Sequence, residues 1–281
     1  MPAFGKRRAL GQHFLRDEIL CDLIVDKFLE EAQSAGCTSL LEIGPGKGAL
    51  TFPLLQRLKK NPIPLVLCEK DRVLAQAWLE RLAPVTSCKV QEADFLTLPE
   101  DLWLTKSPLG VLSNLPYSSG TAILNRLASC TQEIPVMVLM FQAEVAERLR
   151  AERSTKAWGS LSVWIQNCWD VSKLHRVPPG AFSPPPEVFS EVVLLRRRET
   201  TRINVSADPR GPALWQALLK AAFAHRRKML RSGLPHTPPY QNALKISGVD
   251  GAKRAEALEW SEWESLFQAL LSTTDVGTTS V

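Results

Sequence analysis

The sequence predicts an α/β fold, and three observations support this prediction. Segments typical of strands and of helices alternate from about residue 17 to residue 198, which favours a mostly parallel sheet with helices on both faces. Apolar residues make up 45% of the 281 residues, enough for a substantial core. Near residue 199 the composition changes, because Glu199–Pro212 is polar with scattered prolines and two amphipathic segments follow. We therefore expect a larger α/β domain, residues 1–199, and a small all-α domain, residues 200–281.

Each element is expected from its own pattern. Asp17 precedes an apolar stripe with helical spacing, so it is expected to cap a helix that runs to Glu31. The stripe comprises Ile19, Leu20, Leu23, Ile24 and Phe28. Short apolar runs predict strands at 39–43, 64–69, 89–93, 109–113 and 136–141, and amphipathic runs predict helices at 50–59, 71–82, 121–128 and 143–149. Residues 160–169 and 191–196 close the alternating set, and helices are expected at 214–231 and 261–272.

Charge and cysteine usage limit the class of protein. The formal net charge is +5, a mildly basic balance that suits an anionic partner. The six cysteines are scattered without a CxxC pair, and the four histidines form no cluster. We therefore expect reduced core thiols, a cytoplasmic location and no metal site. We expect no signal peptide and no membrane span, because no suitable apolar run occurs, and a monomer is the expected state.

The turn Asn114–Tyr117, with the sequence Asn-Leu-Pro-Tyr, is the most informative motif. It follows the predicted strand 109–113, and open α/β sheets place their ligands at the carboxyl ends of strands. The Asn114 side-chain oxygen and a nearby backbone carbonyl can accept hydrogen bonds from an exocyclic amine. The Tyr117 ring can stack on a flat heterocycle. The motif therefore indicates a site that holds a planar amine as a methyl acceptor, provided that the chain also binds a methyl donor.

A glycine-rich loop and an acidic residue predict an adenosine-type ligand nearby. The loop Gly44–Ala49 follows the predicted strand 39–43 and opens a helix, so its glycines let the backbone approach a ligand closely. Glu69 ends the next strand, at the spacing expected for a carboxylate that binds a ribose diol. Taken alone, the loop also fits a dinucleotide fingerprint or a structural turn, and Glu69 also fits a solvated charge. The pattern leaves open whether the ligand carries phosphates.

Three further segments have both a functional and a structural interpretation. Asp94 follows the third strand, where it can meet the amine of an adenine on which Phe95 packs, although a simple turn explains Asp94 equally well. The stretch Gly11–Leu15 fits a lid over the site or a helix entry with a hydrophobic staple. Phe182 precedes a stiff proline run, so it fits an aromatic partner for Tyr117 or a core-facing ring.

Basic residues gather in three places. They are Lys6, Arg7 and Arg8 near the N-terminus, Arg196 and Arg197 at the end of the last strand, and Arg226, Arg227, Lys228 and Arg231 in the C-terminal region. Such runs are usually solvated faces, but together they also fit a surface that contacts the phosphates of a nucleic acid. We predict this second role for them.

Taken in order, the motifs resemble those of one enzyme family. The series comprises Gly11–Leu15, Leu41–Thr51, Glu69–Asp71, Ala93–Asp94, Asn114–Tyr117 and Phe182–Val188, and Val177–Phe182 and Phe223–Leu230 extend it. From about residue 5 to residue 270 the chain resembles the ribosomal RNA adenine N6-dimethyltransferases of the bacterial small-subunit type, which include the kasugamycin-sensitivity enzyme. The resemblance implies a Rossmann-like class I S-adenosylmethionine-dependent methyltransferase domain at 1–199, with a basic lid segment at 1–16. It also implies a helical RNA-binding domain at 200–281 with a frayed tail.

The resemblance implies roles for individual residues. S-adenosyl-L-methionine is the expected methyl donor, with S-adenosylhomocysteine as the product. The expected donor-binding residues are Gln12, His13, Leu15, Gly44, Gly46, Glu69, Lys70, Asp94, Phe95 and Asn114. Glu69 is expected to hold the ribose hydroxyls. The target adenine is expected between Tyr117 and Phe182, and its two N–H bonds are expected to point to Asn114 and to the Pro116 carbonyl.

The implied reaction is dimethylation of the N6 amines of two adjacent adenosines in the 3′-terminal hairpin loop of 16S ribosomal RNA, with a role in 30S subunit biogenesis. One alternative is a large-subunit adenine N6-methyltransferase of the antibiotic-resistance type, which shares nearly every motif. Another is a non-catalytic RNA-binding assembly factor. The run Val177–Phe182 favours the small-subunit type, and the intact Asn114 and Tyr117 argue against lost catalysis.

The chain departs from the family pattern at several positions. His13 stands where many members have Asn, and Trp158 stands where Tyr is frequent. Ser118-Ser119 follow the tyrosine of the turn, and Phe189 stands where Asp is common. We expect the last two departures to affect how the target strand is seated.

Overall fold

The computed structural model describes residues 13–274 of the chain. These residues form two compact units. The first comprises residues 13–146 and Asp170–Arg197, and the second comprises Glu147–Trp169 and residues 198–274. This division differs from the expected one at residue 199, because Trp158 and Val163 share a core with the C-terminal helices.

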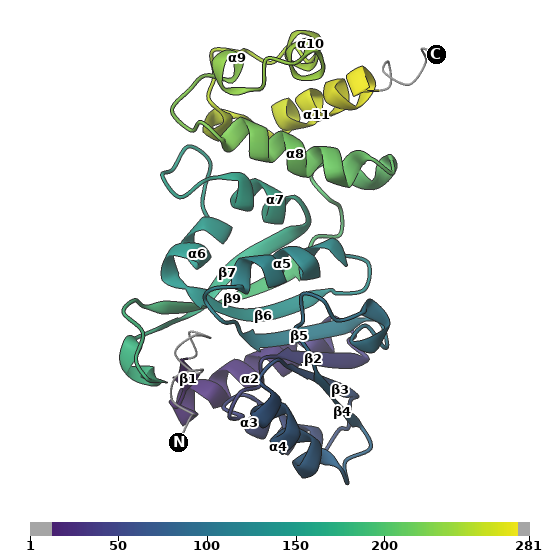
Figure 1. Ribbon diagram of the computed structural model, residues 1–281, viewed down its shortest axis with the longest axis vertical. Coiled ribbons are helices and arrows are strands. Elements are labelled where there is room, and N and C mark those ends of the chain that lie inside the picture. The colour runs from purple at the N-terminus through teal and green to yellow at the C-terminus, as the bar shows by residue number, and fades with distance from the viewer. Residues whose placement is uncertain (1–12, 275–281) are drawn as a thin grey trace. The chain divides into compact units, whose positions relative to one another are not determined.

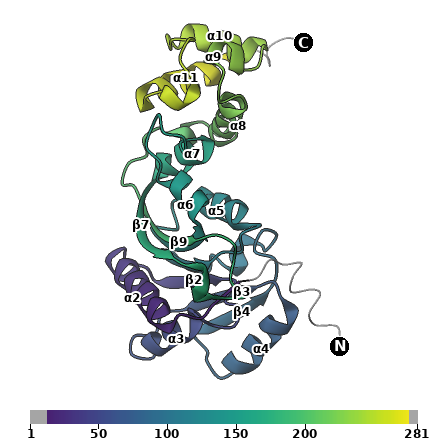
Figure 2. The same ribbon diagram turned by 90° about the vertical axis from the view of Figure 1, so that its left-hand side faces the viewer.

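Among the described residues, the first unit is built on a seven-stranded sheet with the order β4-β3-β2-β5-β6-β9-β7. Its strands are β2 Ser39–Ile43, β3 Leu65–Glu69, β4 Cys88–Glu92, β5 Leu109–Asn114, β6 Val136–Gln142, β7 Trp169–Val177 and β9 Ser190–Arg197. The strands from β4 to β6 are parallel, and β9 pairs antiparallel with β6. β9 and β7 run side by side at one edge (Figures 1 and 2). The predicted α/β class is confirmed.

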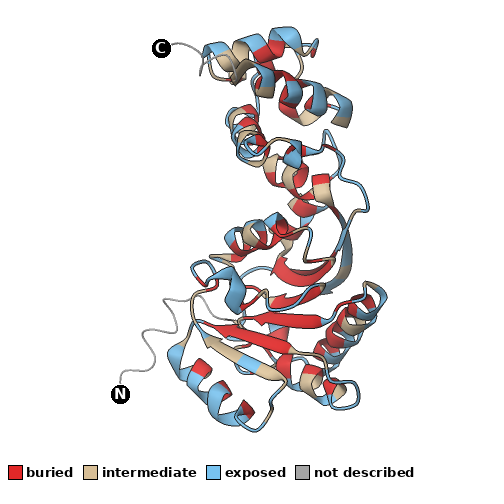
Figure 3. Ribbon diagram, turned by 90° about the vertical axis from the view of Figure 1, so that its right-hand side faces the viewer, coloured by how far each residue is buried: buried red, intermediate tan, exposed pale blue. Residues whose placement is uncertain are grey.

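Both faces of the central part of this sheet are buried. Successive side chains of a strand point to opposite faces, so neighbouring residues report on the two sides. On one face, Leu40 and Leu112 share a core with helices α2, α3 and α4, while on the other face Leu41 and Val111 are equally inaccessible to solvent. Figure 3 shows buried strands and helices whose outward surfaces are exposed. The helices are α2 Glu18–Ser34, α3 Thr51–Leu58, α4 Arg72–Leu82 and α5 Gly120–Ser129, with α6 Ala143–Leu149 at the boundary of the unit.

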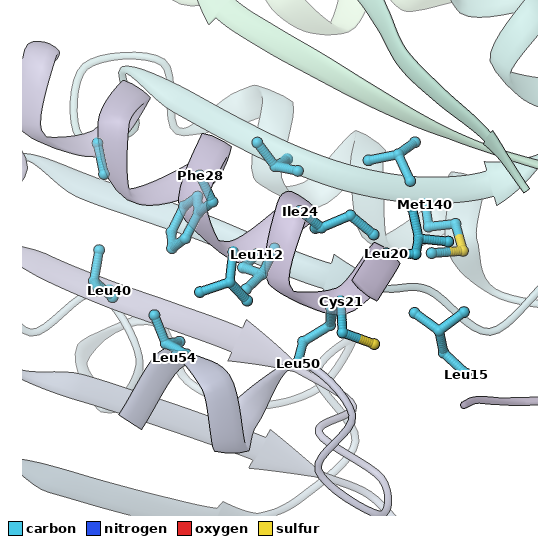
Figure 4. Packing of buried hydrophobic residues seen from close by; sticks show 14 of the residues in the cluster. Leu15, Leu20, Cys21, Ile24, Phe28, Leu40, Leu50, Leu54, Leu112 and Met140 are labelled. Atoms are coloured by element: carbon cyan, nitrogen blue, oxygen red, sulfur yellow. The ribbon is translucent and has the colours of Figure 1, made fainter. Parts of the chain in front are cut away.

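Helix α2 illustrates the packing on the first face. Asp17 caps the helix as predicted, because its carboxylate accepts the Leu20 backbone N–H at 3.1 Å. Leu20 and Phe28 lie in the core (Figure 4). The prediction for Ile19 and Leu23 was wrong, because these side chains are 76% and 54% exposed. Each helical residue turns by roughly 100°, which leaves these two positions beside the buried stripe.

A short two-stranded ladder joins the first described residues to the segment before β9. β1 Phe14–Leu15 pairs antiparallel with β8 Phe182–Ser183, and Leu15 lies opposite Phe182. The Arg16 backbone N–H extends the contact by donating to the Ala181 carbonyl at 2.9 Å. Residues far apart in the sequence therefore meet beside the carboxyl edge of the sheet.

The second unit is helical, as expected for the C-terminal region. Its helices are α7 Ser160–Cys168, α8 Gly211–Phe223, α9 Leu230–Gly233, α10 Pro238–Ile246 and α11 Trp260–Thr274. The 3-10 turns η3 Val205–Ala207 and η4 Ala255–Ala257 also belong to this unit, whereas η1 Glu100–Leu102 and η2 Pro179–Ala181 belong to the first unit. Trp215 lies at the centre of the core, with the Trp263 and Phe267 rings edge-on to it at 5.8 and 5.5 Å between centroids. Trp158 is buried in the same core, so this departure from the family pattern concerns packing.

Two local predictions need correction. The predicted helix 214–231 is interrupted, because α8 ends at Phe223 and residues 224–227 form a turn before α9. Four consecutive polar residues, 225–228, cannot continue an apolar stripe. β7 was missed as a strand because most of its side chains are exposed or half-buried, as an edge strand allows.

No helix within residues 13–274 is long and apolar enough to cross a membrane, and the same residues contain no cluster of potential metal ligands. The six cysteines are free thiols. Burial raises the pKa of Cys21 and of Cys68 to about 12, so both stay protonated as core residues.

Candidate active site

A cavity of about 360 Å³ opens at the carboxyl ends of β2, β3 and β5, within the first unit. Open α/β sheets bind their ligands at this edge, and the volume suits a small organic molecule. The lining includes every described residue that was expected to bind the donor: His13, Leu15, Gly44, Gly46, Glu69, Lys70, Asp94, Phe95 and Asn114. Gln12 lies outside the described residues.

The glycine loop is held open by its own backbone and by two side chains. Gly44, Gly46 and Gly48 have φ of +67°, +56° and +93°, which other residues rarely adopt. A Cβ atom on Gly46 would lie 3.2 Å from the Phe14 ring. The Trp78 indole N–H donates to the Gly46 carbonyl at 2.9 Å. The loop is therefore a fixed wall of the cavity.

Glu69 ties this loop to the end of β3. One carboxylate oxygen accepts the Gly46 N–H at 2.9 Å and the other accepts the Asp71 N–H at 2.8 Å. The carboxylate is only 4% exposed, and burial raises the pKa of Glu69, while the two backbone donors oppose that shift. Each oxygen keeps a second lone pair, which leaves room for the two hydroxyls of a ribose.

Asp94 and Phe95 form the wall beyond Glu69. The Lys70 ammonium lies 2.6 Å from Asp94 Oδ2, and Oδ1 accepts the Leu96 N–H at 3.0 Å. These bonds lower the pKa of Asp94, so it is ionised at neutral pH. The Phe95 ring packs on Trp103, with 5.0 Å between centroids. A charged acceptor and an apolar ring therefore stand side by side, as an adenine requires.

Glu42 is a site residue that sequence reasoning missed. Its side chain lines the cavity and is 2% exposed, and its Oε2 atom has no hydrogen-bond partner among the described residues. Burial raises the pKa of Glu42 to about 8, and the Glu69 charge adds to this effect. The available signal was an acidic residue inside the buried strand β2, where a charge is unfavourable unless a cation pairs with it.

The turn Asn114–Tyr117 forms the opposite wall. Asn114 is half-buried, and its side-chain amide makes no hydrogen bond within the described part of the chain. The role expected for the Pro116 carbonyl was wrong, because this oxygen already accepts the N–H groups of Ser119 at 3.1 Å and Gly120 at 2.8 Å. Both of its lone pairs are thus occupied. The preceding carbonyl, that of Leu115, accepts no hydrogen bond from the described residues.

Tyr117 lines the cavity and is fixed at its hydroxyl end. The phenol forms a hydrogen bond with the Ser190 side chain at the start of β9. Burial raises the pKa of Tyr117. The His13 ring lies 5.4 Å from the Tyr117 ring at an angle of 31°, and His13 Nδ1 is 2.8 Å from the Pro184 carbonyl oxygen. His13, which stands where many family members have Asn, therefore joins Tyr117 to the proline segment.

Phe182 does not reach the cavity. Its side chain is 1% exposed and belongs to the core beneath the sheet, where β8 pairs with β1. The expected sandwich of Tyr117 and Phe182 around a base is therefore not present in this structure. The pairing with Leu15 gives the physical reason, since it directs the ring into the apolar core.

The basic residues divide into those whose side chains bind other parts of their own unit and those for which no such side-chain contact is seen within the described residues. Arg196 forms a bidentate pair with Glu31 at 2.7 Å, which lowers the pKa of Glu31 to about 2. Arg197 and Arg226 donate to backbone carbonyls of their own units. The other basic residues of the C-terminal region, Arg227, Lys228 and Arg231, are exposed to solvent. Lys6, Arg7 and Arg8 lie outside the described residues.

The charges of the cavity fit S-adenosylmethionine better than a nucleotide that carries phosphates. Glu42 can ionise beside an ammonium group or a sulfonium, because a nearby cation opposes the burial that raises the pKa of this carboxyl group. A pyrophosphate would require free N–H groups on the glycine loop, but the Gly46 N–H is already donated to Glu69. The question that the loop sequence left open is therefore answered by Glu42 and Glu69, both acidic and both on the lining.

Comparisons with known proteins agree with this geometry. The family model described as "Ribosomal RNA adenine dimethylase" matches residues 3–271. The chain is 34% identical over 257 residues to ribosomal RNA small subunit methyltransferase A of Xanthomonas oryzae pv. oryzae, covering 92% of this chain and 93% of the relative. It is 36% identical over 266 residues to the protein of that name from Bordetella avium, with 95% of each covered.

Solved structures give the same result for the fold. A dimethyladenosine transferase from Plasmodium falciparum superposes with a TM-score of 0.70 at 22% identity, covering 93% of this chain and 98% of that one. The 23S rRNA methyltransferase ErmE superposes with a TM-score of 0.62 at 25% identity, covering 92% and 99%. From the family model and the relatives together, this chain belongs to the ribosomal RNA adenine dimethylase family.

Proposed function

We propose that this protein uses S-adenosylmethionine to dimethylate the N6 amines of two adjacent adenosines in the 3′-terminal hairpin loop of 16S ribosomal RNA. The observation that supports the proposal best is the open amide of Asn114, which faces a cavity lined by Glu42, Glu69 and Asp94. A polar acceptor for an amine and a negatively charged donor site thus share one cavity. The proposed setting is the cytoplasm, on a 30S particle or its precursor, with the protein as a monomer.

Asn114 and Leu115 supply the two acceptors for the target amine. The donor, when bound, supplies a methyl group on a positively charged sulfur. The Asn114 side-chain oxygen accepts one N–H of the adenine amine, and the Leu115 carbonyl, whose lone pairs are open, accepts the other. This geometry favours a pyramidal nitrogen with its lone pair directed at the methyl group. Catalysis is therefore mainly positioning and electrostatics.

Tyr117 holds the target base against these acceptors. An adenine must leave its stack to enter the cavity, which costs a few kcal/mol, and stacking on an aromatic ring returns about 1–3 kcal/mol. The hydrogen bond to Ser190 fixes the orientation of the Tyr117 ring. After the first transfer the nitrogen releases one proton to solvent and keeps one N–H and its lone pair, so one of the two acceptors still holds the amine during the second transfer.

Relatedness favours the small-subunit substrate over the large-subunit one. The relatives named for the small subunit are 34–36% identical to this chain, whereas ErmE, which is named for 23S rRNA, is 25% identical. A purely structural assembly factor would not need Asn114 and the Leu115 carbonyl to be kept open. We therefore propose a catalytic function rather than a purely structural one.

The experiment is methyl transfer from labelled S-adenosylmethionine to under-methylated 30S subunits and, in parallel, to protein-free large-subunit RNA, followed by nucleoside analysis. We expect N6,N6-dimethyladenosine from the 30S subunits alone. Label in the large-subunit RNA alone would contradict the substrate. Donor binding without label in either sample would favour a binding factor.

A further inference from the structure

The segment Pro184–Ser190 is anchored at both ends to residues of the cavity. Pro184 accepts a hydrogen bond from His13, and Ser190 bonds to Tyr117. His13 and Tyr117 both line the cavity. An exposed side chain between these two anchors therefore belongs to a segment that is tied at both ends to the cavity wall.

Phe189 is such a side chain. It is 42% exposed, and its backbone carbonyl is held by the Ala143 N–H at 2.9 Å. This bond and the pairing of Ser190 with Gln142 fix the backbone at this position. The ring is therefore presented from a rigid strand end.

The Arg176 guanidinium lies over the Phe189 ring, 4.5 Å from its centroid. Arg176 is exposed on the edge strand β7, and its guanidinium makes no ion pair or hydrogen bond within the described part of the chain. A flat cation and a flat ring thus form a partly exposed pair without an acidic partner. Nucleic-acid bases stack on aromatic rings and on guanidinium planes, and a guanidinium also attracts phosphate.

We propose that Phe189 and Arg176 form a platform that receives the nucleotide next to the target adenosine, an inference that rests on the proposed function. The flanking base stacks on the platform while the target base enters the cavity. The platform thereby holds the strand at the point where it leaves the helical stack. It recognises a single-stranded, unstacked RNA segment, since a base inside a duplex has no free face.

A second pair in the same unit serves as a matched control. Phe52 is 43% exposed, and the Arg81 guanidinium lies 4.9 Å from its ring centroid. This pair belongs to α3 and α4 and does not line the cavity. If any exposed Phe–Arg pair bound RNA, both pairs would contribute equally.

The test measures binding of a short RNA hairpin whose loop carries two adjacent adenosines and a 2-aminopurine on their 5′ or 3′ side. Stacking quenches the fluorescence of 2-aminopurine. For Phe189→Leu, which keeps an apolar side chain but removes the flat ring, we expect about tenfold weaker binding and loss of quenching on one side. Phe189→Tyr should retain both, and Phe52→Leu should bind as the wild type does.

Unchanged affinity and unchanged quenching in Phe189→Leu would overturn the platform, as would equal losses in Phe189→Leu and Phe52→Leu. Arg176→Gln should weaken binding and Arg81→Gln should not, which tests the second half of the pair. The proposed function is judged separately, since a wild-type protein that quenches 2-aminopurine but methylates no adenosine in 30S subunits would contradict it and leave the platform standing.

Discussion

The donor side and the target side of the cavity differ in how far the protein completes them. On the donor side, Glu69 is bonded to Gly46 and Asp71, and Asp94 is bonded to Lys70. On the target side, the side-chain amide of Asn114 has no partner within the described residues. The donor wall is thus built before any ligand arrives, except for Glu42. The target wall keeps its acceptors open and is completed by the RNA.

The difference follows from the origin of each wall. The donor wall comes from the ends of β2 and β3, neighbouring parallel strands in the middle of the sheet. The target wall combines the turn after β5 with the segment before β9, which is tied to β1 through the pairing of Leu15 with Phe182. Strand ends are fixed by the core, and Asn114 shares this property, but the position of Tyr117 in the second wall also depends on its contacts with Ser190 and His13. We expect substitutions to separate the two sides, as follows.

Replacing Asn114 by Ala should have the largest effect on the reaction. One of the two acceptors of the target amine is lost, and removal of one such positioned group typically lowers turnover on the order of 10²–10³-fold. Donor binding should weaken less than turnover and remain measurable, because Asn114 is only one of the expected donor contacts and the groups expected to hold the ribose and adenine, Glu69 and Asp94, are untouched. Turnover on 30S subunits and calorimetric titration of the donor measure the two sides.

Asn125 on α5 is exposed, so Asn125→Ala controls for the loss of an amide in the same region. It should retain full turnover. A wild-type rate for Asn114→Ala would sink the proposed mechanism, and an equal loss of donor affinity and turnover would show that the two sides are not separable.

Replacing Phe182 by Ala decides between a core residue and a stacking residue. The ring is 1% exposed in the core, so its removal should lower the free energy of unfolding by about 3 kcal/mol. The exposed Phe189 provides the control, because Phe189→Ala should lower stability far less. Chemical denaturation gives both values. A stable Phe182→Ala protein with impaired RNA binding would instead restore the base sandwich expected from the sequence.

Prediction from the sequence located residues correctly where the end of a strand defines the position, while their roles stay predictions. The glycine loop and Asp94 follow strands, Glu69 and Asn114 end strands, and each lines the cavity. These positions depend on the topology of a parallel sheet, which the alternation of elements predicts. The same reasoning gave the α/β class and the cap at Asp17.

Prediction failed where a role depends on a partner distant in the sequence. The burial of Phe182 results from pairing with Leu15, more than 160 residues away, and no local pattern encodes it. The Pro116 carbonyl is taken by the first N–H groups of α5, a matter of backbone geometry. Glu42 was overlooked because a buried strand was interpreted only as packing, although a charge within it was itself a signal.

The unpaired Glu42 on the donor side predicts a dependence of stability on pH. Its pKa is raised from 4.5 to about 8 in the folded protein, so between these values the folded state binds more protons than the unfolded state. Stability of the ligand-free protein should therefore fall as pH rises through this window, by about 2 kcal/mol from pH 5.5 to pH 7. The contribution is fully present below pH 4.5 and lost above pH 8.

The variant Glu42→Gln isolates this effect, because it cannot titrate and retains the shape of the side chain. The free energy of unfolding, measured by denaturant titration at several pH values, should decline less steeply for the variant than for the wild type. Parallel curves would mean that Glu42 is already paired in the free protein and that the donor wall is complete without its ligand.

The smallest expected effects concern the basic residues of the second unit. Arg226 donates to the Lys156 and Trp158 carbonyls at 2.9 and 2.7 Å, while the neighbouring Arg227 is exposed. Arg226→Ala should therefore lower the melting temperature. Arg227→Ala should leave it unchanged and reduce the slope of log affinity for RNA against log salt by about 1, the value for one lost phosphate contact.

Binding of the same RNA hairpin at several salt concentrations measures this slope, and thermal unfolding measures stability. The pair is informative because both variants remove one positive charge from adjacent positions in the turn after α8. Suppose that both variants reduce the salt slope of RNA affinity equally and neither lowers the melting temperature. The carbonyl contacts of Arg226 would then not restrain its side chain, and all the basic residues of the turn would contact RNA phosphates alike. If only Arg227→Ala loses slope, the division between structural and RNA-facing arginines extends from the first unit, where Arg196 is paired with Glu31, to the second.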